Sequence, residues 1–192
     1  MHRSLFTALA ISIALPLSAF AADSYTVDPA HTYPRFSINH LGFSTMQGRF
    51  DKTSGKVTLD RAAKKGSVEL AIETASISTG FAKRDEHLKS PDFFNAAEFP
   101  TITYKSTAIR FKGDMPSSVE GNLTISGITK PVTFTVDAFH CGPDPMDPTK
   151  TKQKCGADAS AKIMRSDFGV KYAVPAVGDE VKLVLEIEAV KD

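Results

Sequence analysis

VEGNLTISGITKPVTFTVDA, residues 119–138, carries the clearest structural signal in this chain. Apolar or small residues alternate with polar ones up to the Ser126-Gly127 pair, and the alternation resumes at Val132. A period of two places alternate side chains on opposite faces of a strand. Because a Ser-Gly pair between two such runs is typical of a tight turn, the stretch predicts a β-hairpin with one apolar and one polar face.

The same alternation recurs along most of the chain. It appears in residues 34–40, 46–50, 57–59, 68–72, 102–104, 109–111 and 181–189. Strands with a single apolar face are typical of antiparallel sheets. The pattern therefore predicts an all-β fold of about eight strands. Periodicity alone leaves a closed barrel and a sandwich open, although closure would remove exposed sheet edges.

One segment breaks this rhythm. Within residues 79–98, the stretch Phe81–Lys89 has helical spacing, and Ser90-Pro91 after it suggests a second helix start. A shorter break covers residues 165–169. Because neither repeats nor a linker interrupt the pattern, we expect a short helical insertion in a single domain spanning residues 22–192.

Residues 1–21 have the features of a secretory signal peptide. Arg3 is followed by an apolar run and by Ala19-Phe20-Ala21, a small-x-small cleavage pattern. A membrane anchor is the alternative, but Pro16 interrupts the apolar run, which falls short of the ~20 residues that span a bilayer. We therefore expect the mature protein in the periplasm or secreted, with no integral membrane segment.

Cys141 and Cys155 are the two cysteines of the chain. A pair in an oxidising compartment favours a disulfide over a metal site, and a redox-active pair usually has CxxC spacing. The sequence thus predicts a Cys141–Cys155 bridge, which closes a Pro-rich segment, residues 142–148, that we expect not to form a strand.

Composition excludes several classes of protein. The 192 residues are 42% hydrophobic and 23% charged, which argues against disorder and coiled coils. Removal of the predicted signal peptide with Arg3 leaves 22 basic residues against 22 acidic ones. Because a neutral chain without polybasic runs attracts nucleic acid only weakly, we expect no nucleic-acid partner.

Seven short stretches, taken in order, resemble the YceI-like family of periplasmic polyisoprenoid-binding proteins over residues 23–190. They are VDPAHT (27–32), FSINHLG (36–42), GRF (48–50), RDEHLKSPDFF (84–94), FP (99–100), GNLTISGITKPV (121–132) and RSDFG (165–169). The resemblance implies a closed, lipocalin-like antiparallel β-barrel with a helix packed against it. It also implies a long isoprenoid lipid or a similar amphiphile as ligand, and it raises a homodimer as one arrangement.

Alternation supplies a set of inward-facing residues for such a site. Of the 13 Phe, 11 lie beyond residue 21, and the chain has no Trp, which suits an apolar tunnel. The candidate ligand-binding residues are Phe36, Ile38, His40, Met46, Phe50, Ile102, Tyr104, Leu123, Ile125, Phe134 and Val136, with Phe93, Phe94 and Phe99 expected to narrow one mouth. The alternative for each residue is a place in a packed core.

Polar candidates are few. The histidines lack zinc-site spacing, so we expect no metal. His40 shares the inward face and either bonds a ligand head group or is a core histidine. Arg84, Asp85 and His87 favour a local salt-bridge and capping cluster that fixes the helical segment to the barrel, with a polar rim near the head group as the alternative. Arg165 and Asp167 favour a lock between strands.

Catalysis finds little support in the sequence. No G-x-S-x-G elbow, free cysteine or glycine-rich phosphate loop is present. We therefore expect a non-enzymatic periplasmic carrier without cofactor that encloses a polyprenyl or quinone-type lipid. A ligand-free envelope-stress or interaction module with a side-chain-filled barrel is the second hypothesis. An isoprenoid isomerase or hydrolase that uses His40 or Arg84 is the weakest.

Overall fold

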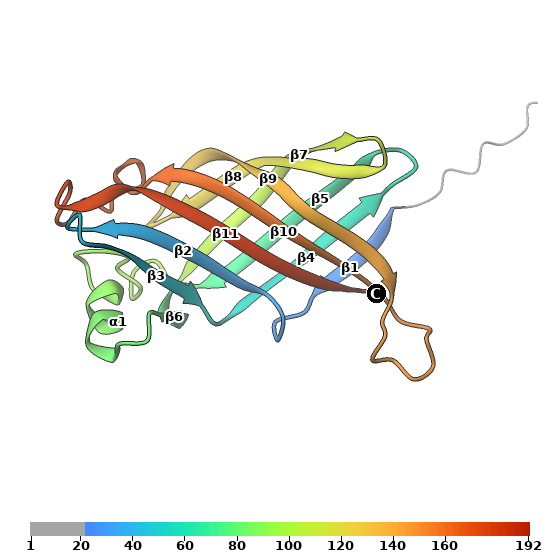
Figure 1. The fold of residues 1–192 in the computed structure, drawn as a ribbon, viewed down its shortest axis with the longest axis horizontal. Coiled ribbons are helices and arrows are strands. Elements are labelled where there is room, and N and C mark those ends of the chain that lie inside the picture. The colour runs from blue at the N-terminus through green and yellow to red at the C-terminus, as the bar shows by residue number, and fades with distance from the viewer. Residues whose placement is uncertain (1–21) are drawn as a thin grey trace, which may run out of the picture.

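Strands dominate residues 22–192, the part of the chain that this computed structural model describes (Figure 1). The predicted signal peptide, residues 1–21, lies outside the described residues. The elements are β1 (Asp23–Val27), β2 (Tyr33–His40), β3 (Ser44–Phe50), β4 (Thr53–Asp60), β5 (Lys65–Glu73), η1 (Thr74–Ser76), β6 (Ile77–Ser78), α1 (Ala82–Lys89), β7 (Thr101–Lys112), β8 (Met115–Ile125), β9 (Ile128–Pro143), β10 (Gln153–Met164), η2 (Arg165–Phe168) and β11 (Val177–Lys191).

The sheet closes on itself. Antiparallel pairing runs β1-β4-β5-β7-β8-β9-β10-β11, and β11 returns to β1 where Val27 pairs with Ala189. In the earlier part of β11, Val181 pairs with Ile38 of β2 instead, and β2 in turn pairs with β3. Since β1 and β2 pair with successive lengths of the same strand, the fold is a closed eight-stranded antiparallel barrel. The structure confirms the all-β barrel and excludes the sandwich.

Inward faces follow the alternation. Ile72 of β5 pairs with Ile102 of β7, and Leu70 pairs with Tyr104, which in turn pairs with Leu123 of β8. All five side chains are buried, whereas their neighbours on β7 are exposed threonines and a lysine. Residues that pair directly point to the same side of the sheet, so these rows form the interior of the barrel.

At one end of the barrel the strands separate. β5 and β7 pair as far as Glu73 and Thr101, but the chain then leaves to pair β6 with the end of β3. Residues 79–100, which include α1, lie beside β3 and β6 at this end (Figure 1). Within residues 22–192, no helix is both long and apolar enough to cross a membrane.

The helical insertion is shorter than predicted. α1 covers Ala82–Lys89, but the expected second helix start at Ser90-Pro91 is wrong, because residues 91–98 form turns. Ser90 has an extended backbone, as the ring of the following proline requires, and its N–H donates to the carbonyl of His87. The Ser-Pro pair therefore ends a helix.

The opposite end of the barrel is packed. Tyr25, Leu59, Cys155 and Ala189 form a second buried cluster there. Cys141 and Cys155 pair directly across β9 and β10 and form the predicted disulfide. The loop of residues 144–152, which connects these two strands, projects from this end of the barrel (Figure 1). The expectation that no strand follows Cys141 is partly wrong, since β9 continues to Pro143 opposite Gln153.

Candidate functional site

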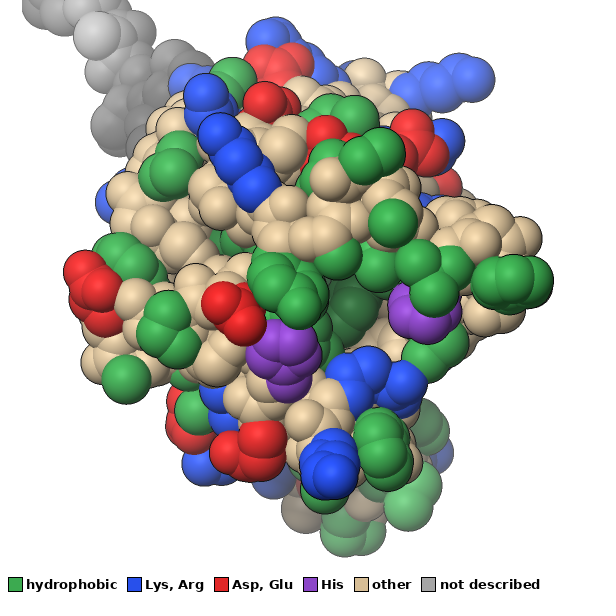
Figure 2. Space-filling view, turned by 90° about the vertical axis from the view of Figure 1, so that its left-hand side faces the viewer, with side chains coloured by type: hydrophobic (Ala, Val, Ile, Leu, Met, Phe, Trp, Pro, Cys, Tyr) green, Lys and Arg blue, Asp and Glu red, His purple; other side chains and the backbone are tan. Residues whose placement is uncertain are grey.

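An apolar cavity of about 540 Å³ occupies the open end of the barrel. Its walls come from the inward faces of β2, β3, β5, β7, β8, β9, β10 and β11, and α1 and the loop after η2 contribute to its mouth. Figure 2, which faces this end, shows a hollow with hydrophobic side chains inside it and histidine and basic side chains at its edge. The volume lies within the ~300–1,000 Å³ typical of small-molecule sites.

All but two of the predicted ligand-binding residues line this cavity. They are Phe36, Ile38, His40, Met46, Phe50, Phe93, Phe94, Ile102, Tyr104, Leu123, Ile125 and Phe134. The ring of Phe50 packs between those of Phe36 and Phe94, with centroids 6.1 Å and 5.8 Å away. His40 is exposed at the end of β2, so the core-histidine alternative is wrong.

Phe99 and Val136 are placed elsewhere. The N–H of Phe99 donates to the carbonyl of Asn95 in a turn that reverses the chain, and the ring packs on Gly127, outside the cavity. Val136 keeps the inward direction of Phe134, but it lies further along β9. It lines a second apolar cavity of about 90 Å³. The expectation that Phe99 narrows the mouth is therefore wrong.

Several lining residues were not in the predicted set. Leu70, Ile72, Val181, Leu183 and Leu185 lie on strand faces whose alternation already indicated them. The lining also includes residues outside the strands: Leu88 of α1, Phe168 of η2, and Phe81, Val170 and Tyr172 from the connecting segments. Because these segments have no period of two, strand alternation gives no signal for them.

The mouth carries a cluster of rings. His87 packs edge-on against Phe93 and Tyr172, with centroids 5.0 Å and 5.3 Å away, and Phe93 and Tyr172 are 5.2 Å apart. The Nε2 atom of His87 also lies 2.9 Å from the carboxylate of Asp92. These contacts connect α1, the following turn and the loop after η2 across one side of the mouth.

Arg84 is held by the backbone beside it. Its guanidinium donates to the hydroxyl and to the carbonyl of Thr79, both at 2.7 Å. The carboxylate of Asp85 accepts a hydrogen bond from the N–H of Thr79 at 2.9 Å. The pair thus anchors the start of α1 to the end of β6, as the predicted local cluster requires, while Arg84 still contributes to the cavity lining.

Arg165 locks the far side of the mouth, but with a different partner from the one predicted. The buried guanidinium donates to the carbonyls of Val170, Val177 and Gly178 at 2.8–3.0 Å. The carboxylate nearby is Asp179, which accepts two hydrogen bonds from Ser166, and these bonds lower its pKa. Asp167 is exposed, so the prediction of an Arg165–Asp167 pair is wrong.

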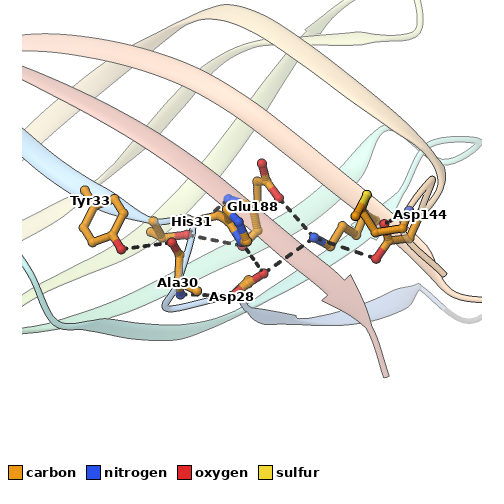
Figure 3. Close-up of polar contacts among 9 residues, drawn as sticks. Asp28, Ala30, His31, Tyr33, Asp144 and Glu188 are labelled. Carbon is orange, nitrogen blue, oxygen red and sulfur yellow. Dashed lines mark hydrogen bonds and ion pairs between the residues drawn. The ribbon is translucent and has the colours of Figure 1, made fainter.

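A separate polar cluster lies towards the packed end (Figure 3). Asp28, His31 and Glu188 bring ligand atoms within 4.8 Å of one another, a grouping that resembles a metal site. However, the ammonium group of Lys154 lies 3.2 Å from Glu188 and 3.6 Å from Asp28. Because this cation already pairs with both carboxylates, we assign the cluster to ion pairing. The hydrogen bond from His31 also lowers the pKa of Asp28.

Fold and site together define a lipocalin-like barrel, closed by backbone pairing, with an apolar interior that opens at one end. The model of the YceI-like domain matches residues 25–189, nearly all of this barrel. The chain belongs to the YceI-like family.

Individual relatives agree with this assignment. A UPF0312 protein of Pseudomonas aeruginosa is 36% identical over 196 residues, with both chains fully covered. The crystal structure of Burkholderia cenocepacia BcnA superposes with a TM-score of 0.67 at 27% identity, covering 84% of this chain and 98% of BcnA. A polyisoprenoid binding domain from Saccharophagus degradans, implicated in plant cell wall breakdown, shares the fold at 15% identity. Its TM-score is 0.64, with 88% of this chain and 98% of that domain covered.

Proposed function

We propose that this protein binds the tail of a long-chain isoprenoid lipid, of the polyprenyl or quinone type, and carries it without chemical change. The observation that carries the proposal is the 540 Å³ cavity with walls of aliphatic and aromatic side chains. An isoprenoid tail offers methyl groups and double bonds, which match such walls and need no polar partner. The alternative of a side-chain-filled barrel requires a packed interior, and this cavity argues against it.

The expected affinity follows from the size of the cavity. At ~30 Å³ for a water-sized group, 540 Å³ holds about 18 such groups. At ~0.3 kcal/mol per non-hydrogen atom, a tail of that size contributes about 5–6 kcal/mol, a dissociation constant of roughly 0.1 mM or somewhat below. Polar contacts with the head group would add to this.

The mouth supplies groups for a polar head. His40, His87, Lys83 and Arg84 contribute to the lining at the exposed end, whereas the deeper walls are apolar. We therefore propose that the tail lies inside and that the head remains at the mouth, where water and these donors are available. The predicted signal peptide and the disulfide support a periplasmic location for the carrier.

Neighbouring positions on β7 give a matched test of this function. Ile102 is buried in the cavity wall, while Thr103 points outward and is exposed. Ile102→Trp places an indole in the cavity, and Thr103→Trp places one outside. Since the chain has no other Trp, each variant carries a single fluorescent reporter.

The measurement is native mass spectrometry of delipidated protein mixed with a polyprenyl alcohol, together with indole fluorescence. We expect the wild type and Thr103→Trp to take up the alcohol, and Ile102→Trp to bind at least tenfold more weakly. Failure of the wild type to bind, or equal binding by both variants, would contradict the proposal.

A further inference from the structure

The interior of the barrel is divided into two cavities in series. The main cavity of about 540 Å³ opens at the mouth, and the cavity of about 90 Å³ lies towards the packed end. Tyr104, Phe134 and Leu185, from β7, β9 and β11, line both. These three side chains therefore form a partition between the two spaces.

Hydrogen bonds hold the partition in place. The hydroxyl of Tyr104 donates towards the carbonyls of Val119 on β8 and Val132 on β9, at 2.9 Å and 3.1 Å. Burial raises the pKa of this hydroxyl well above its usual value, so the donor stays protonated. Phe134 packs edge-on against the Tyr104 ring, with centroids 5.2 Å apart and planes at 83°.

A glycine leaves room for the ring. A Cβ atom at Gly121 of β8 would lie 2.6 Å from Cζ of Tyr104 and 2.7 Å from its hydroxyl oxygen. Glycine within a strand often marks such a close approach. Because any other residue at 121 would push the ring away, this backbone position is matched to the partition.

The space beyond the partition is as apolar as the space before it. Its lining includes Val57, Val68, Val119 and Ile187. A lipid tail would therefore meet no polar barrier beyond Tyr104. The barrier to its advance is the volume of the Tyr104 and Phe134 rings.

We propose that Tyr104 and Phe134 set the longest isoprenoid tail that this protein can enclose. This inference rests on the proposed function and specifies the ligand by tail length. A main cavity of about 18 water-sized groups holds roughly three or four isoprene units. Up to that length each added unit raises the affinity roughly tenfold. Beyond it, further units remain outside and add little.

The test compares tail lengths on one protein. Delipidated wild type is titrated with geraniol, farnesol, geranylgeraniol and longer polyprenols, by displacement of a fluorescent fatty-acid probe. We expect the affinity to rise with each unit and then level off near four units. In Phe134→Ala the two cavities join, and we expect the levelling-off to move to a longer tail by one unit or more.

Phe36→Ala is the matched control. It removes the same ring from the wall of the main cavity, but Phe36 does not line the second one. We expect weaker binding at every length and a smaller shift in the levelling-off than in Phe134→Ala, because no second cavity is joined. Phe134→Leu repeats the test with a smaller loss of packing, and urea unfolding of each variant establishes that it is folded.

The outcomes separate the two proposals. If no polyprenol binds the wild type, the proposed function fails and this inference fails with it. If binding is retained but the affinity keeps rising with length, or if both alanine variants shift equally, the partition sets no limit and only this inference is overturned.

Discussion

The single side chain of Arg165 donates hydrogen bonds to three backbone carbonyls. Its buried guanidinium satisfies three carbonyls at the point where η2 ends and β11 begins. An arginine presents its donors in a fixed fork, so one side chain can reach carbonyls on two segments. The loop that carries Tyr172 and lines the mouth thus depends on one residue.

Arg165→Met is expected to lower the free energy of unfolding by about 3 kcal/mol or more. The substitution leaves three carbonyls without their donor, and an unsatisfied buried polar group costs ~1–3 kcal/mol. Arg165→Lys should lie between this variant and the wild type. Urea denaturation is the measurement, with Arg110→Met, which removes an exposed ion pair to Glu120, as the control that should lose much less stability. Equal losses at both sites would contradict this role.

Asp147 organises the loop closed by the disulfide. Its carboxylate accepts hydrogen bonds from the N–H groups of Lys152, Thr151 and Thr149 and from the Thr149 hydroxyl, at 2.8–3.2 Å. The Lys152 bond is the largest contribution, followed by the Thr149 hydroxyl, and together these bonds lower the pKa of Asp147. The charged form is therefore stabilised in the folded state.

The pH dependence follows from the sign of that shift. Because the folded pKa lies below the unfolded value of ~3.9, the contribution of Asp147 is complete above that pH. It is lost as the pH falls through the lowered folded pKa. In an NMR titration, the amide signals of Thr151 and Lys152 should change well below the usual aspartate range. Asp147→Asn should abolish the change, and a midpoint near 3.9 would refute the argument.

At the scale of elements, most of the strands were predictable, whereas β1, β10 and the connections were not. Alternation places Ile102, Tyr104, Leu123 and Phe134 on the inward face, because pairing and burial require a period of two. Residues 79–100 and 165–176 follow no such period, since their direction depends on turns and long-range hydrogen bonds. Tyr172 was missed for this reason, and the Ser90-Pro91 pair was misinterpreted.

The cross-link between β9 and β10 is expected to stabilise the fold without affecting the cavity. Closing a loop of 14 residues contributes roughly 3 kcal/mol in the chain-entropy view. The double variant Cys141→Ser/Cys155→Ser should lose about this amount in urea unfolding. Lipid uptake should not change, because the bridge lies at the packed end. Addition of reductant should weaken the wild type and leave the variant unaffected.

For the whole molecule, β11 is the strand that closes the barrel. It pairs with β10 along most of its length, with β1 near its end and with β2 before that. Its inward residues Val181, Leu183 and Leu185 line the cavity. Closure and binding therefore depend on the same strand, so occupancy of the cavity should stabilise the entire fold.

A bound lipid is expected to raise the thermal midpoint. At a hundred times its dissociation constant, a ligand of the folded state contributes ~2.7 kcal/mol, which corresponds to roughly 5–10 °C for a chain of this size. Circular dichroism of delipidated protein with and without a polyprenol measures the shift. Ile102→Trp, whose indole narrows the cavity, should show a smaller shift at the same lipid concentration, and a similar shift in both proteins would point to binding elsewhere.

The position of the mouth at one end of the barrel also bears on how a bound lipid would be transferred to another molecule. With Tyr25, Leu59 and Ala189 buried at the opposite end, the proposed carrier would load and unload its lipid through the mouth. A donor and an acceptor cannot both face the mouth at once. On the proposed function, transfer would proceed as successive encounters of a diffusing carrier, and its rate would scale with the number of free molecules, unlike flow through a fixed conduit.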